Sequence, residues 1–282
     1  MSCEIRKIPL GVGNCIEMPS LLSSMIVTPD NFSVTEANLN SKTFWQNAVK
    51  ADPSARIHVW PYFDMFENIS EEAVYEDTPL SYQAVRDGNY RFRFSIAQGL
   101  CLHKAMFTHR AKSGRVFLVD VDGQVICTKG SDGLYRGLSI QLLNTEKLQF
   151  NDGSVTTKSP IVLALRNNKE LDRDGYIFTS SWFYELVRLK DVTIEVVSVS
   201  ASSIVVDVYV TCDKTAVNGL VAADFILLDS GGSAQTFSLS AGPNGRYTLS
   251  GTFVDGTLTL KPPATLSIDA YEHGAPITID VP

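Results

Sequence analysis

The residues that could carry catalysis or bind a metal are few and poorly spaced. His103 and His109 lie six positions apart, which would place them on different faces of a helix. Asp-x-Asp-Gly occurs at residues 120–123 and 172–175 and could begin a calcium loop. Neither copy is followed by the glutamate that such a loop requires six positions after the glycine. We interpret the first copy as a hairpin turn, and the sequence predicts no metal site.

The sequence motifs that hold phosphates, dinucleotides, catalytic zinc or a nucleophilic serine are also missing. An active site could still be built from Asp172, Asp174 and His109, but nothing in their spacing favours it. Cys101 and His103 are too close in sequence for the usual nucleophilic pair, so we interpret them as packing residues. We therefore expect a non-enzymatic protein with no catalytic residue, no metal-binding or cofactor-binding residue, and no cofactor.

Charge and composition exclude several classes of partner. The net charge of −7 and the pI near 5.1 argue against sequence-specific nucleic-acid binding, which needs clustered Lys and Arg. Apolar runs end well before the ~20 residues that cross a bilayer, and no signal-peptide pattern is visible. We expect no membrane insertion and folding in a cytoplasm. The five cysteines form no Cys-x-x-Cys pair and are odd in number, which favours reduced thiols.

Short strands at regular spacing dominate the C-terminal third of the chain. Many of the apolar runs alternate with period two, and turn sequences such as Gly-Pro-Asn-Gly at 242–245 separate them. This pattern is typical of an immunoglobulin-like β-sandwich, and we assign it to residues 187–282. The expected strands cover residues 192–199, 204–211, 224–228, 236–239, 245–253, 257–260 and 266–271.

Residues 36–186 predict a β-rich α+β body domain. Strict alternation of apolar and polar residues over 90–96 predicts a strand with Tyr90, Phe92 and Phe94 on its core face. Cap-type residues, early acids and apolar stripes predict one or two helices. The remaining expectations are helices at 41–51 and 100–112, a helical turn at 70–73, a hairpin over 115–127, and an extended N-terminal arm at residues 1–35.

Aromatic residues crowd the start of the body domain. Two interpretations stay open: these rings pack the core, or some of them contact another subunit, because interface centres are enriched in Trp, Tyr and Phe. The candidate oligomer-interface residues are Trp60, Tyr62, Phe63 and Phe66.

Several segments in a fixed order carry a resemblance to a known family. They are the start Met-Ser-Cys at 1–3, Glu-Glu-Ala-Val-Tyr-Glu-Asp-Thr-Pro at 71–79, the basic-aromatic strand at 87–94, and the hairpin at 116–127 with the following Ser-Asp-Gly-Leu-Tyr-Arg-Gly. Together they resemble structural proteins of tailed bacteriophages that infect Bacteroidota, crAss-like phages included, and in particular tail-tube-like and neck or ring proteins.

The resemblance implies a virion structural protein whose sheet-rich body closes into a homo-oligomeric ring or tube in the tail or neck. Such a ring would form part of the DNA conduit, and a negative chain agrees with a lumen that repels phosphate. The implied partners are copies of itself and neighbouring tail, neck or portal proteins, and the implied localisation is the virion. The alternative is a surface-exposed binding module whose immunoglobulin-like domain recognises a glycan or a host ligand.

Overall fold

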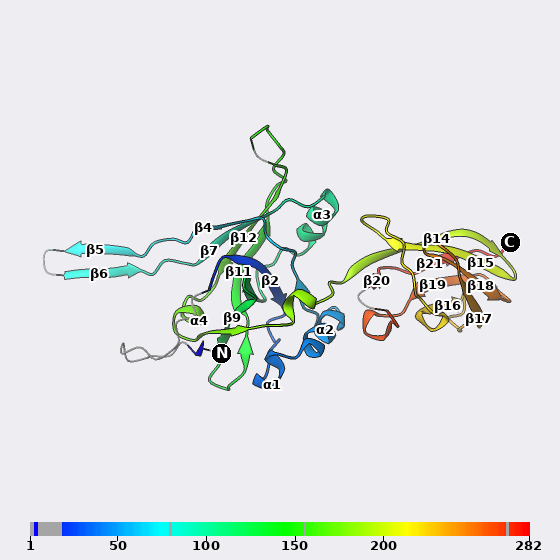
Figure 1. Cartoon of the computed structure of the whole chain (residues 1–282), viewed down its shortest axis with the longest axis horizontal. Coiled ribbons are helices and arrows are strands. Elements are labelled where there is room, and N and C mark those ends of the chain that lie inside the picture. The colour runs from blue at the N-terminus through cyan, green and yellow to red at the C-terminus, as the bar shows by residue number, and fades with distance from the viewer. Residues whose placement is uncertain (1–2, 5–18, 79–80, 155, 269–270) are drawn as a thin grey trace. The chain divides into compact units, whose positions relative to one another are not determined.

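The computed structural model describes residues 3–4, 19–78, 81–154, 156–268 and 271–282. Strands make up 43% of it and helices 14%, so the expected mainly β class is confirmed. The chain divides into two compact units, and each is described by itself (Figure 1). Unit 1 comprises Met1–Trp45 and Ser54–Leu186, and unit 2 comprises Gln46–Pro53 and Val187–Pro282.

Unit 1 is built on one eleven-stranded antiparallel sheet. Its main path runs β1-β13-β9-β8-β11-β12-β7-β4, while β10 pairs with β9 and β2 pairs with β8 and β3. The strands are β1 (Cys3–Glu4), β2 (Leu22–Thr28), β3 (His58–Val59), β4 (Met65–Asn68), β7 (Arg91–Ile96), β8 (Arg115–Asp120), β9 (Gln124–Lys129), β10 (Tyr135–Arg136), β11 (Leu138–Thr145), β12 (Ser159–Leu165) and β13 (Gly175–Thr179).

β8 lies inside this sheet and pairs with three strands. It lies beside β2 along its whole length and beside β11 and β9 at its two ends. Residues 116–119 are at most 1% exposed, which suits their unbroken apolar sequence. The hairpin predicted over 115–127 is confirmed as β8 and β9, and Gly123 adopts a φ of +78° in the turn.

The strand predicted at 90–96 is confirmed as β7. Phe92 and Phe94 are buried in the core, and Tyr90 packs against its margin. The Phe63 ring stacks on Phe94 with 4.1 Å between ring centroids. Period-two alternation thus places one face of β7 on the core, as expected.

The described part of the chain contains four short α-helices: α1 (Glu36–Leu39), α2 (Lys42–Lys50), α3 (Leu100–Thr108) and α4 (Lys169–Asp172). The predictions of helices at 41–51 and 100–112 are confirmed. Trp45 of α2 stacks on Trp182, with centroids 4.6 Å apart, and both indole N–H groups donate to the Leu39 carbonyl. The described residues include no helix long and apolar enough to cross a bilayer.

Two local expectations differ from the structure. The helical turn predicted at 70–73 is wrong, because the Ile69 and Glu71 amides donate to the Arg91 and Asn89 carbonyls and keep this segment extended. Residues 1–35 were expected as an arm. Of these, residues 5–18 lie outside the described residues, whereas β2 is a buried strand of the sheet because its apolar sequence pairs with β8.

Unit 2 is a two-sheet sandwich. One sheet has the order β17-β18-β15-β14-β20 and the other the order β16-β19-β21. With strands lettered along the chain, the first sheet runs D-E-B-A and the second C-F-G, as in constant-type immunoglobulin domains, and β20 is added beside A. The strands are β14 (Lys190–Ser200), β15 (Ser203–Val210), β16 (Phe225–Asp229), β17 (Phe237–Ala241), β18 (Arg246–Gly251), β19 (Gly256–Leu260), β20 (Tyr271–His273) and β21 (Ile277–Ile279).

The core of this sandwich is aliphatic except for a few rings. Tyr247 is 1% exposed, donates its hydroxyl hydrogen to the Val217 carbonyl at 2.8 Å and accepts from the Leu220 amide at 3.2 Å. The strand predicted at 266–271 is wrong for residues 266–268, which follow a 3-10 turn at Pro263–Thr265 and lie in no strand. Tyr271 enters β20, and residues 269–270 lie outside the described residues.

Candidate functional site

A β-hairpin that projects from the body is the most distinctive surface feature of unit 1 (Figure 1). It consists of β5 (Val74–Thr78) and β6 (Ser81–Arg86), which form a two-stranded sheet of their own. Both lead out of the edge pair β4 and β7, whose antiparallel pairing ends at Asn68 and Phe92. Ten residues at about 3.3 Å each give the ribbon from Asn68 to Thr78 a reach of roughly 30 Å.

The base of this ribbon is fixed by backbone contacts. Besides the hydrogen bonds of Ile69 and Glu71, Gly88 lies so close to the opposite strand that a Cβ there would be 1.8 Å from the Glu71 carbonyl oxygen. Farther out, the Val74 side chain is 46% exposed and Tyr75 is 53% exposed. The ribbon therefore leaves the body in a defined direction and carries apolar side chains into solvent.

The predicted interface aromatics are divided between core and surface. Trp60 is 4% exposed and belongs to the core of unit 1, and its carbonyl accepts from the Ser24 hydroxyl. Phe63 and Phe66 are partly buried and pack against the same core. Tyr62 is 38% exposed and stacks on Tyr184, with centroids 5.9 Å apart. Of the four, only Tyr62 is an exposed residue.

A polar pocket of about 450 Å³ lies on unit 1 where β8, β9 and the α4 region meet. Sequence reasoning did not identify it. All of its lining residues except Gly130 have polar or charged side chains, and four of these side chains are basic. The lining residues are Arg115, Thr128, Lys129, Gly130, Ser131, Arg136, Asn167, Glu170, Arg173 and Asp174.

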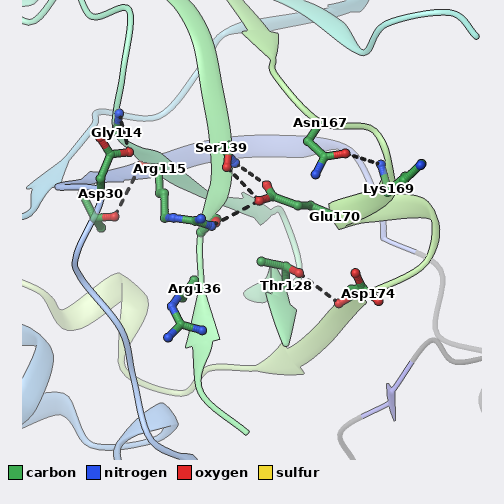
Figure 2. Close-up of polar contacts among 12 residues, drawn as sticks. Asp30, Gly114, Arg115, Thr128, Arg136, Ser139, Asn167, Lys169, Glu170 and Asp174 are labelled. Carbon is green, nitrogen blue, oxygen red and sulfur yellow. Dashed lines mark hydrogen bonds and ion pairs between the residues drawn. The ribbon is translucent and has the colours of Figure 1, made fainter. Parts of the chain in front are cut away.

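Glu170 organises one wall of this pocket (Figure 2). Its carboxylate accepts from the Ser139 amide at 2.6 Å, from the Ser139 hydroxyl at 2.7 Å and from Arg115 Nη1 at 3.4 Å. Arg115 Nη1 also donates to the Gly137 carbonyl at 2.8 Å. The Arg115 and Glu170 side chains are 19% and 15% exposed, so this ion pair is only partly screened by water.

The other charged pairs of the pocket are local and more exposed. Arg136 donates to Asp132, four positions earlier, and this hydrogen bond lowers the Asp132 pKa to about 2. Arg173 pairs with its neighbour Asp174 and lowers the pKa of that carboxyl. Lys129 Nζ lies over the Tyr135 ring, 5.2 Å from its centroid. These contacts orient the cationic groups of the pocket lining.

The residues considered for chemistry do not form a joint site. Asp172 accepts a hydrogen bond from the Tyr90 hydroxyl, which raises the Tyr90 pKa to about 12, and Asp174 pairs with Arg173. His109 instead caps α3 and contacts His58, with ring centroids 4.4 Å apart. Among the described residues, no group of three His, Cys, Asp or Glu side chains could hold a metal ion.

The Asp-x-Asp-Gly segment at 120–123 is a hairpin turn, as interpreted. The buried Asp120 carboxylate accepts from the amides of Asp122 and Gln124 through Oδ1 and from Ser20 through Oδ2. All of these contacts are to backbone donors, two in the turn and one in the segment before β2. The carboxylate is therefore used to close the β8–β9 hairpin.

The expectation of reduced thiols is confirmed for Cys127, which is free and fully buried, and burial raises its pKa far above the usual range. It is wrong for Cys101 and Cys212, each of which is disulfide-bonded. An odd total of five cysteines leaves room for such bonds.

Comparison with known proteins does not assign this chain to a family. No protein-family model matches the chain, and no curated protein matches it.

Proposed function

We propose that this chain is a non-enzymatic structural subunit that assembles with copies of itself into a ring or tube, as in the tail or neck of a bacteriophage. The observation that carries the proposal is the projecting β5–β6 hairpin. A two-stranded hairpin is marginally stable in water unless something covers it. Its exposed Val74 and Tyr75 are the kind of side chains that interfaces bury.

The outer edge of the eleven-stranded sheet supports the same proposal. β4 ends the main path of the sheet, and Met65 in it is 51% exposed. An open strand edge can pair with a strand of a neighbouring copy, and repetition of that contact by rotation closes a ring. The resemblance to tail-tube-like and ring proteins points to the virion as the place of such a ring, with tail, neck or portal proteins as neighbours.

The alternative binding function receives less support from unit 2. A module that recognises a glycan through its loops usually offers exposed aromatic rings. Among the described residues of unit 2, the large apolar side chains with the greatest exposure are valines, such as Val197 and Val254. We therefore favour a role for unit 2 as a covering domain of the assembly.

Removal of the hairpin tests the proposal. Residues 74–86 would be replaced by a short Gly-Ser turn, and native mass would be measured by light scattering over a range of concentrations, with negative-stain imaging of the same samples. We expect rings, tubes or a discrete large oligomer for the native chain and a folded monomer for the variant. Val254→Ser, which removes an exposed apolar side chain from unit 2, serves as the control and should assemble like the native chain.

Two outcomes would contradict the proposal. The native chain could remain a monomer at every concentration, with no ring in the images. Alternatively, the variant without the hairpin could assemble as well as the native chain and have the same melting temperature as the native chain. The first outcome would favour the binding function, and the second would exclude the hairpin as the assembly element.

A further inference from the structure

The polar pocket of unit 1 carries an excess of positive charge in a chain whose net charge is −7. Four basic and two acidic side chains line it. The acids inside the pocket and Asp132 beside it balance most of this charge through the pairs described above. The three guanidinium groups of this cavity of about 450 Å³ are chemically suited to carboxylates, since arginine presents several donors in a plane.

One donor in the pocket wall has no acceptor within the described chain. Arg115 Nε is buried without a hydrogen-bond partner, while Nη1 of the same guanidinium is bonded to Gly137 and Glu170. A buried donor left without a partner costs about 1–3 kcal/mol.

The projecting hairpin has the opposite charge. Residues 71–87 contain five acids and one base, which is Arg86. Glu71 pairs with Arg91 at the base of the ribbon, whereas Glu72 and Glu76 are exposed. The hairpin points away from its own body, and the pocket lies on β8, β9 and the α4 region of that body (Figure 1). An acidic ribbon and a basic pocket on one chain are complementary when two copies meet.

We propose that the acidic β5–β6 hairpin of one copy docks at the basic pocket of the next copy, with hairpin carboxylates received by the guanidinium groups around Arg115 and Arg173. This inference rests on the proposed assembly function and names the surface that receives the hairpin. The contact is heterologous, because it joins two different surfaces of the same chain. Such a contact propagates around a ring or along a tube.

Charge reversal on each side of the contact tests the inference. The variants are Glu76→Lys in the hairpin, Arg173→Glu in the pocket, and the two combined. Both residues are exposed, so the fold should tolerate each change. Light scattering would give the concentration at which half of the protein is assembled. We expect each single variant to raise this concentration about tenfold or more, and the combined variant to recover most of the loss. Assembly of the native chain should also weaken as salt rises.

Glu195→Lys on unit 2 makes the same change in net charge as Glu76→Lys, but outside the proposed contact, and should leave assembly unchanged. If the native chain assembles and both single reversals assemble equally well, the inference is overturned and the proposed function stands. Failure of the combined variant to recover assembly also overturns it. If the native chain does not assemble at all, both the inference and the proposed function are overturned.

Discussion

Glu170→Ala should destabilise unit 1 specifically. The change removes the acceptor of three hydrogen bonds, two from Ser139 and one from Arg115, and leaves a cation 19% exposed in the pocket wall. Hydrogen bonds to charged groups contribute about 1.5–3 kcal/mol each. The three bonds share one carboxylate and are not additive, and partial exposure screens the ion pair, so we expect a loss of about 3 kcal/mol. For a unit of this size that corresponds to a fall in melting temperature of about 10 °C.

Differential scanning calorimetry of the full chain is the appropriate assay, because the two compact units can be followed in one scan. The transition of unit 1 should move down, while that of unit 2 stays in place. Asp174→Ala is the matched control: it removes an acid from the same pocket, but the Asp174 side chain pairs only with an exposed neighbour, Arg173. A Glu170→Ala melting temperature within about 2 °C of the Asp174→Ala value would refute this reasoning.

Two further predictions concern the other buried polar groups. Tyr247→Phe leaves the Val217 carbonyl and the Leu220 amide without the hydroxyl and should cost unit 2 about 2 kcal/mol in urea unfolding. Tyr209→Phe is the control, because Tyr209 is only partly buried and its hydroxyl donates to Glu195; equal losses for the two tyrosines would disprove the argument. Burial lowers the pKa of His109, so folding favours the neutral imidazole. The stability that depends on this neutral form is fully present above about pH 6.5, the usual pKa of histidine, and is lost as the pH falls through the lowered pKa of the folded state. His109→Gln should therefore lose less stability than the native chain between pH 7.5 and 5.5, and equal losses would contradict this assignment.

The parts of the fold that sequence could predict are those set by local pattern. The alternation of apolar and polar residues over 90–96 identified β7. The Asp-Gly pair at 122–123 identified the hairpin turn that Asp120 closes. In unit 2, short alternating runs between turns were enough to predict the sandwich. These signals are contained within a few neighbouring residues, so tertiary contacts did not need to be known.

The parts that could not be predicted depend on residues far apart in sequence. The acids at 70–73 suggested a helix start, but backbone bonds to Asn89 and Arg91 hold that segment extended. The wall of the polar pocket joins Arg115, Ser139 and Glu170, which share no motif and come from two strands and a short helix. The spacing of apolar residues could not show that β5 and β6 would leave the sheet. A strand has the same sequence pattern whether or not other strands flank it.

The position of β8 inside the sheet has a consequence for how the chain acquires its fold during synthesis. Ile26 of β2 can pair with Phe117 only after β8 has been synthesised. Ile126 of β9 can likewise pair with Ile177 only after β13 has been synthesised. Pairings of such long sequence separation form slowly and leave apolar strand edges uncovered in the meantime. Unit 2 instead contains β14 and β15, which are joined by a tight turn and can pair as soon as they emerge. Nascent unit 1 therefore exposes apolar strand edges for longer than nascent unit 2 does.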